Sequence, residues 1–252
     1  MNSINNLDKL IASTSLPYKD SYNDKVVAFV HAKGNSERVI SKNLRVLGDC
    51  PLFCHAIRIA KKANLVDVVI IDSDDDKILK IGEEYGAIPL KRPAELATNH
   101  ATGDNLAYWQ ASNVPKSSVC IQVVPTAPFL NASSVDKAIQ MLLDNPALDS
   151  VVGCYEEALY TWTNGRPDYY NDDGTIPNSF ELGKTIYETT GMYANHTEAV
   201  LRTGKRLNPD NAKALVLSRI ETIDINTEED FEFAKTVWRG VEGTTFKKHN
   251  NL

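Results

Sequence analysis

The stretch of residues 26–44 carries the residue types in this chain that are best suited to binding phosphate. Residues 26–30 form a continuous apolar run, typical of a strand buried on both faces. Small, polar and cationic residues follow it: Lys33, Gly34, Asn35, Ser36, Lys42 and Asn43. A small-residue loop after a strand presents backbone N–H groups to an anion, and the lysines add positive charge. The sequence therefore predicts a phosphate-binding loop. An ordinary charged surface loop stays open as the alternative, because neither the P-loop spacing nor a three-glycine dinucleotide fingerprint is present.

The elements around this loop alternate between strands and helices. Apolar runs predict strands at residues 26–30, 66–71, 88–90, 119–124 and 150–154. Helical spacing or capping signals predict helices at residues 51–63, 74–85, 104–111 and 133–143. This order predicts an α/β fold with a doubly wound, mostly parallel, Rossmann-like sheet, whose ligands bind outside the carboxyl ends of the strands.

Two other groups of residues invite a metal interpretation that their spacing does not support. The acidic run 72–76 lacks the alternating ligands and the glycine of an EF-hand, so Asp74 is predicted to cap the next helix, and Ser133 or Ser134 a later one. The four cysteines fit no zinc or redox spacing, and buried, reduced thiols are expected.

Composition limits the classes of function. The chain has 252 residues with a net charge of −6, which argues against a general nucleic-acid-binding surface but allows a local cationic pocket. No apolar run is long enough to span a membrane, and the first 24 residues lack a signal-peptide core, so a cytoplasmic protein is expected. We predict a polar arm at 1–24, one main domain at 25–240 and a loose tail at 241–252. Turn residues mark an inserted lobe of loops and short antiparallel strands at about 155–195.

Four segments, in order, resemble the acylneuraminate (sialic-acid-type) cytidylyltransferase family. They read A-K-G-N-S-E-R-V-I-S-K-N-L from Ala32, R-P-A-E-L-A from Arg92, P-T-A-P from Pro125 and I-D-I-N-T-E-E-D from Ile223. The resemblance covers about residues 25–240. Lys33 stands where the family usually has arginine, which keeps the charge but loses the bidentate fork.

The resemblance implies that CMP is transferred from CTP to a 2-keto-3-deoxy sugar acid for surface glycan synthesis, with release of pyrophosphate. It implies that Arg92, Ala101 and Thr102 contact the cytosine base. It also implies that the inserted lobe covers the acceptor and forms a homodimer. The expected partners are therefore CTP and a small sugar acid, with neither nucleic acid nor membrane.

Nucleotidyl transfer needs an aligned triphosphate, cations on its oxygens and Mg²⁺. Lys33 and Lys42 supply charge, and Asp224, at the end of a strand predicted near 219–225, is the expected catalytic carboxylate and Mg²⁺ ligand. The family reads I-D-I-D here. Alternation along a strand would place Asn226 on the same face as Asp224, where its carbonyl oxygen is a second ligand with one charge fewer.

The acceptor side departs most from the family. The expected pocket residues are Gln122, Val124, Thr126, Trp162 and Thr189. Val124 replaces a usual glutamine and Thr189 a usual asparagine, while Gln122 shares a strand face with Val124. These changes predict that N-acetylneuraminate is a poor acceptor. Two alternatives remain at this point: a nucleotidylyltransferase for another acceptor or nucleotide, and a binding protein that keeps the fold without the chemistry.

Overall fold

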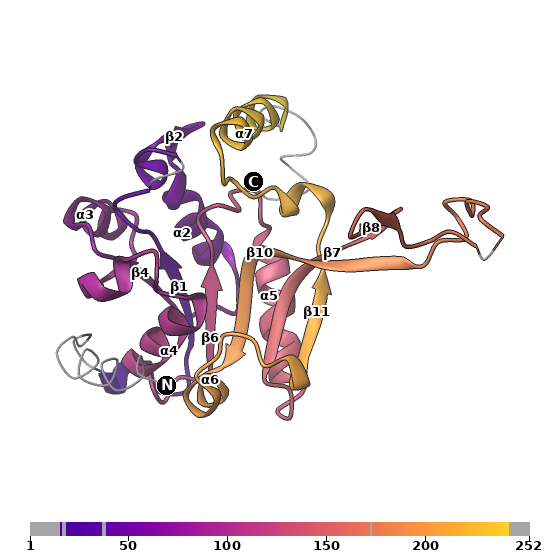
Figure 1. The fold of residues 1–252 in the computed structure, drawn as a ribbon. Coiled ribbons are helices and arrows are strands. Elements are labelled where there is room, and N and C mark those ends of the chain that lie inside the picture. The colour runs from indigo at the N-terminus through magenta and orange to yellow at the C-terminus, as the bar shows by residue number, and fades with distance from the viewer. Residues whose placement is uncertain (1–15, 17–18, 37–38, 172, 242–252) are drawn as a thin grey trace.

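The computed structural model describes residues 16, 19–36, 39–171 and 173–241, and these contain one seven-stranded sheet with the order β11-β7-β10-β6-β1-β4-β5 (Figure 1). The strands are β1 (Val26–His31), β4 (Val68–Ser73), β5 (Ile88–Lys91), β6 (Val119–Val123), β7 (Ser150–Ala158), β10 (Lys184–His196) and β11 (Ala212–Val216). Neighbours are parallel except where β10 pairs with β6 and β7. The predicted fold class, a mostly parallel α/β sheet, is confirmed.

Helices cover both faces of this sheet because β1 is apolar on both. Val26, Ala28 and Val30 belong to the core cluster built with α2 (Leu52–Lys62), α3 (Asp76–Glu84) and α5 (Ala132–Leu143). Val27 and Phe29 point the other way, into the cluster built with α4 (Gly103–Asn113) and α6 (Thr197–Thr203). Successive side chains of a strand point to opposite faces, so an unbroken apolar run is what a central strand requires.

The strand order reverses beside β1. The chain leaves β1 toward β4 and β5 on one side and later returns to β6 on the other side. In open α/β sheets, ligands bind at such a switch point, outside the carboxyl ends of the strands. The loop after β1 and the turn after β6 both open at this edge.

An extension that we call the arm, residues 155–188 without the undescribed residue 172, projects from the body of the molecule (Figure 1). Its base is the outer part of the β7–β10 pair, which continues to the partners Lys184 and Ala158. It also carries the short pair β8 (Trp162–Thr163) and β9 (Arg166–Pro167). The pairing of β7 with β10 shifts register between Glu188 and Tyr193, so a bulge separates the arm from the body.

The remaining elements are short or lie near the C-terminus. They are the pair β2 (Val46–Leu47) and β3 (Cys50–Pro51), the 3₁₀ helices η1 (Lys19–Tyr22), η2 (Lys42–Leu44), η3 (Ala94–Ala97), η4 (Pro209–Asn211) and η5 (Arg219–Thr222), and α7 (Glu228–Val241). Within the described part of the chain, no helix combines the length and apolarity needed to cross a membrane.

The strand predicted near residues 219–225 is wrong. The final strand is β11, which pairs with β7, while residues 219–222 form η5. The physical reason is a capping box: the side chain of Glu221 accepts hydrogen bonds from the backbone N–H and the hydroxyl of Ser218, at 3.0 and 2.7 Å. These bonds favour a helical turn over an extended backbone.

Two predicted helix caps are also wrong. Asp75, not Asp74, caps α3 and accepts from the N–H of Lys77 at 2.7 Å. Asn131, not Ser133 or Ser134, caps α5. The four cysteines are buried and free, as predicted. Predictions for residues 1–15 and for the tail beyond Val241 fall outside the described residues.

Candidate functional site

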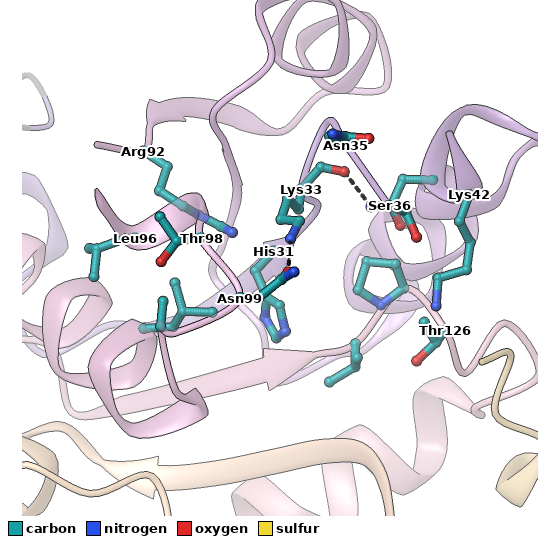
Figure 2. Close-up of a pocket in the computed structure, with 15 residues that line it drawn as sticks. His31, Lys33, Asn35, Ser36, Lys42, Arg92, Leu96, Thr98, Asn99 and Thr126 are labelled. Carbon is teal, nitrogen blue, oxygen red and sulfur yellow. Dashed lines mark hydrogen bonds between the residues drawn. The ribbon is translucent and has the colours of Figure 1, made fainter. Parts of the chain in front are cut away.

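A cavity of about 520 Å³ opens at the switch point (Figure 2). Its lining comes from the end of β1 and the loop after it, from η2, from the segment that follows β5, from α4 and from the turn after β6. The lining residues are His31, Lys33, Asn35, Ser36, Lys42, Asn43, Arg92, Leu96, Thr98, Asn99, Ala101, Leu106, Val124, Pro125 and Thr126. The structure thus brings together most of the residues predicted to bind the nucleotide, although they are far apart in sequence.

Hydrogen bonds within the protein hold the loop after β1 in place. The side-chain amide of Asn43 donates to the carbonyl oxygen of Lys33 at 2.8 Å, and Lys33 Nζ donates to Asn99 Oδ1 at 2.7 Å. Lys42 Nζ donates to the carbonyl oxygen of Ile225 at 2.7 Å. Two ammonium groups are therefore fixed at the cavity. In Figure 2, Lys42 lies at one end of the cavity and Lys33 lies nearer its centre.

Gly34 has a different role from the predicted one. Its backbone N–H donates to Asp74 Oδ1 at 2.9 Å, so this donor is already bonded and is not directed to a phosphate. A Cβ at position 34 would lie 2.7 Å from the Cβ of Asp75, so glycine is needed for the loop to approach the start of α3. Of the three N–H groups predicted to bind phosphate, those of Asn35 and Ser36 are left for an anion.

Arg92 is anchored by a chain of buried polar side chains. Its Nε donates to Asp72 Oδ1 at 2.7 Å, and its Nη2 donates to the carbonyl oxygen of Asp72 at 3.1 Å. The other carboxylate oxygen of Asp72 accepts from Gln110 at 2.7 Å, and Gln110 in turn accepts from Gln122 at 2.8 Å. All four side chains are buried, so the guanidinium has one fixed orientation at the cavity wall. Gln122, a predicted acceptor residue, lies in this chain and not in the cavity lining.

His31 lines the cavity and was missed by the sequence analysis. Its Nδ1 is buried and has no hydrogen-bond partner among the described residues. Burial, together with the nearby charges of Arg92 and Arg206, lowers the pKa of His31 to about 3, so the ring is neutral at physiological pH. Its position gave a usable signal: a polar residue that ends a buried strand at the carboxyl edge of a sheet. The loop residues Thr98 and Asn99 carried no comparable signal.

Three more predicted site residues, like Gly34 and Gln122, lie outside the cavity lining. The hydroxyl of Thr102 accepts from the N–H of Asn105 at 3.2 Å and caps α4. Thr189 is buried and its hydroxyl donates to the carbonyl oxygen of Gly153 at 3.0 Å, across the β7–β10 pair. Trp162 lies in the arm with 64% of its surface exposed, where it lines a separate apolar pocket of about 280 Å³.

Asp224 and Asn226 lie side by side even though no strand forms there. Asp224 Oδ2 accepts from the side-chain amide of Asn226 at 2.5 Å and from the hydroxyl of Thr190 at 3.1 Å. Asp224 Oδ1 is buried and has no partner within the described chain. A buried carboxylate oxygen without a donor suits a divalent cation, because an unpaired buried charge is otherwise costly.

The backbone between these two residues attaches them to the rim of the cavity. The N–H of Ile225 donates to the carbonyl oxygen of Thr126 at 2.9 Å, and its carbonyl oxygen accepts from Lys42. Thr126 and Lys42 both line the cavity. Ile225, which bonds to both of them, is the residue next to Asp224 in the chain.

Comparisons with known proteins show the family to which the chain belongs. The sequence model of a family described as cytidylyltransferase matches residues 27–172. The chain belongs to the cytidylyltransferase family. The family predicted from the four sequence segments is confirmed, and with it the enzyme class, a nucleotidyltransferase.

The similarity to the following relatives extends over nearly the whole length of each of them. Pseudaminic acid cytidylyltransferase of Campylobacter jejuni is 25% identical over 226 residues, covering 85% of this chain and 97% of that protein. CMP-N,N'-diacetyllegionaminic acid synthase of Legionella pneumophila is 26% identical, covering 82% and 93%. The solved structure of CMP:2-keto-3-deoxy-manno-octonic acid synthetase complexed with CTP has a TM-score of 0.65 at 15% identity, covering 86% of this chain and 99% of that one. This last likeness supports the fold of the cytidylyltransferase described here.

Proposed function

We propose that this cytidylyltransferase transfers CMP from CTP to a 2-keto-3-deoxy sugar acid of the nonulosonate type and releases pyrophosphate. The observation that carries the proposal is the cavity at the switch point, which joins two fixed ammonium groups at the phosphate loop to a buried arginine. The names of the relatives, which act on pseudaminic and legionaminic acids, support the class of acceptor.

The chemistry of the two walls supports one orientation of the nucleotide. The base lies at the wall of Arg92 and Ala101, because the guanidinium is a fixed donor that matches the carbonyl oxygen of cytosine. The triphosphate lies at the loop after β1, where Lys33 and Lys42 offer positive charge and Asn35 and Ser36 offer backbone N–H groups.

The reaction needs no covalent intermediate. A hydroxyl of the acceptor attacks the α-phosphorus of CTP, a new P–O bond forms, and the bond to pyrophosphate breaks. Negative charge increases on the phosphate oxygens in the transition state, and preorganised lysines stabilise it there without reorganising. Lys42, fixed by the carbonyl oxygen of Ile225, is the group best placed for this role.

Asp224 and Asn226 are the residues that would hold Mg²⁺. The buried Oδ1 of Asp224 would be one ligand and the amide oxygen of Asn226 would be a second, and substrate phosphates and water would supply the others. Bound there, Mg²⁺ would supply neutralisation of the charge on the phosphate oxygens. Asp224→Ala is expected to abolish Mg²⁺-dependent transfer while CTP binding by the cavity persists.

We further propose that the acceptor is less polar than N-acetylneuraminate or differently substituted. Val124 and Thr126 line the cavity beyond the phosphate loop, and together they offer one hydroxyl. A glutamine at position 124, as is usual in the family, would offer a side-chain amide with two N–H donors. A site that lacks groups to pair with a polar substituent binds that substrate weakly.

As part of the same proposal, the protein is a cytoplasmic homodimer formed through the arm. The support is the set of large apolar side chains that the arm exposes, Tyr160, Trp162, Tyr170, Ile176, Phe180, Ile186 and Tyr187. Large exposed apolar side chains gathered on one extension favour an interaction surface.

The test is pyrophosphate release from each of four nucleoside triphosphates, combined with a panel of sugar acids that includes N-acetylneuraminate. We expect release with CTP and a nonulosonate other than N-acetylneuraminate. A kcat/KM of about 10⁴ M⁻¹s⁻¹ or more with N-acetylneuraminate would contradict the acceptor proposal. Tight CTP binding without turnover on any acceptor would instead favour a binding protein that has kept the fold.

A further inference from the structure

Thr190 adopts a backbone conformation that a threonine rarely takes. Its φ is +57°, in the left-handed region, and it lies within the bulge where β10 shifts register against β7. The Cβ of an L-residue crowds the following carbonyl group in this region, and the branched side chain of threonine makes the conformation less favourable still. Such strain persists only where the surrounding structure fixes the backbone.

Contacts on both sides of Thr190 supply that restraint. On one side, the hydroxyl of Thr189 is bonded to the carbonyl oxygen of Gly153. On the other side, the carbonyl oxygen of Gly191 accepts from the N–H of Val124 at 3.0 Å. A Cβ at position 191 would lie 2.8 Å from the Cβ of Ala127, so the strand passes directly against the turn after β6. These contacts restrain the bulge without using the side chain of Thr190.

The side chain of Thr190 makes a bond that glycine could not make. Its hydroxyl donates to Asp224 Oδ2 at 3.1 Å, the same oxygen that accepts from the amide of Asn226 at 2.5 Å. Two donors from different parts of the chain thus converge on one oxygen of the carboxylate, and the other oxygen, Oδ1, is buried and unpartnered within the described residues. This arrangement fixes which oxygen the carboxylate presents.

We propose that Thr190 is a positioning residue that, together with Asn226, orients Asp224 so that its Oδ1 is presented to a divalent cation. The proposal rests on the proposed function for the cation and adds the residue that holds its ligand. Partners that orient a metal ligand through hydrogen bonds strengthen metal binding considerably. The strained backbone is the cost of placing a hydroxyl where the fold would more easily accept glycine.

The decisive variant is Thr190→Gly, because it relieves the strain and removes the hydroxyl at once. Melting temperature is measured without metal, and Mn²⁺ affinity is measured by electron paramagnetic resonance in the presence of CTP. We expect the melting temperature to stay the same or rise by a few degrees, and Mn²⁺ affinity to fall by about 10-fold or more. Protein that becomes more stable while it binds the cation less well cannot be explained by general damage to the fold.

Two matched controls separate the hydroxyl from the backbone. Thr190→Ser keeps the hydroxyl, and its Mn²⁺ affinity should stay within about twofold of the parent. Asn164→Gly relieves another left-handed residue, φ +52°, in the exposed turn between β8 and β9, and should leave Mn²⁺ affinity unchanged. If Thr190→Gly does not fold, Thr190→Ala removes the same hydroxyl and takes its place.

The proposal is overturned if Thr190→Gly or Thr190→Ala binds Mn²⁺ as the parent does. It is also overturned if Thr190→Ser loses as much affinity as Thr190→Gly, because the hydroxyl would then not be the cause. Failure of the proposed function has a different signature, since the parent would then release no pyrophosphate whatever its Mn²⁺ affinity. The two failures are therefore distinguishable in the same set of proteins.

Discussion

The cavity and the arm are built from the same sheet but by opposite means. Around the cavity, buried polar side chains bond to one another over long sequence distances, as Asp72 does with Arg92 and Gln110. In the arm, most side-chain hydrogen bonds lie at exposed positions, such as that from the hydroxyl of Thr161 to Asp168 at 2.7 Å. The large apolar side chains of the arm face solvent, and Phe180 is 83% exposed.

This difference separates two kinds of recognition. The geometry of the cavity is set by the strand order and by a buried network, so it cannot be altered without disturbing the core. None of the described arm residues belongs to a buried core cluster, so the surface of the arm can change with little effect on stability. A nucleotide common to a whole family suits the first kind of site, and a variable acceptor or a second subunit suits the second kind. Each of the following predictions tests one side of this contrast.

The largest effect is expected from Arg92→Ala. It leaves the buried carboxylate of Asp72 without its ionic partner, and breaking a buried pair in this way costs about 3–5 kcal/mol of unfolding free energy. Lys184→Ala is the control from the arm, since Lys184 pairs with Glu156 at an exposed position and should cost less than about 1 kcal/mol. Urea denaturation measures both. Equal losses for the two variants would remove the distinction between the two regions.

Lys42→Ala is expected to weaken the chemical step. Loss of one positioned charge reduces transition-state stabilisation by on the order of 3 kcal/mol, or roughly 100-fold in kcat/KM. The variant Lys33→Arg keeps the charge at the neighbouring position and should retain activity. Steady-state pyrophosphate release measures both. Parental turnover of CTP by Lys42→Ala would show that this loop does not bind the triphosphate.

His31 is expected to make the stability of the protein depend on pH. The pKa of His31 is about 3 in the folded protein and near its ordinary value of 6.5 when unfolded, so protonation favours the unfolded chain. Its contribution is fully present above about pH 6.5 and is lost as the pH falls toward 3. Between pH 7 and pH 5 the parent should lose about 2 kcal/mol more unfolding free energy than His31→Gln. Urea denaturation at several pH values measures the unfolding free energy of both proteins. Equal losses in the two proteins would contradict the lowered pKa of His31.

The smallest effect is expected from Trp162→Ala in the arm. The side chain is mostly exposed, so the unfolding free energy should change by no more than about 0.5 kcal/mol. CTP affinity, measured by calorimetry, should also be unchanged, because Trp162 does not line the cavity. A drop in CTP affinity would mean that the arm and the cavity act as one site.

The sequence predicted the fold well where burial leaves a clear pattern. β1, β4 and β6 are buried on both faces, so their apolar runs are unbroken and easy to recognise. β11 lies at the edge of the sheet and is half exposed, so its residues carry no such pattern and the strand was missed. Ser218 and Glu221 have the spacing of a capping box, which predicts a helical turn. The isoleucines of the same segment favoured a strand instead.

The candidate site was predictable only in part. The loop after β1 was predicted from its residue types, and Arg92 was predicted because its segment matches a known family. The link from Arg92 to Gln122 was not predictable, because each contact joins residues whose separation follows no local period. Trp162 and Thr189 were assigned to the acceptor pocket by their place in the chain, and the structure places both outside the cavity. Sequence position in an insertion says little about which cavity a side chain reaches.

The antiparallel strand β10 has a consequence for the order in which the chain folds. It lies between β6 and β7, yet it is synthesised after both, so these two strands lack their shared partner until residues 184–196 have been made. Unpaired strand edges invite association with other chains. The arm shortens this period, because it makes β7 and β10 the two legs of one hairpin, and their pairing is local in sequence compared with that of β10 and β6. We therefore expect pairing to begin in the arm and to proceed past the bulge, which carries the last strand into the centre of the sheet.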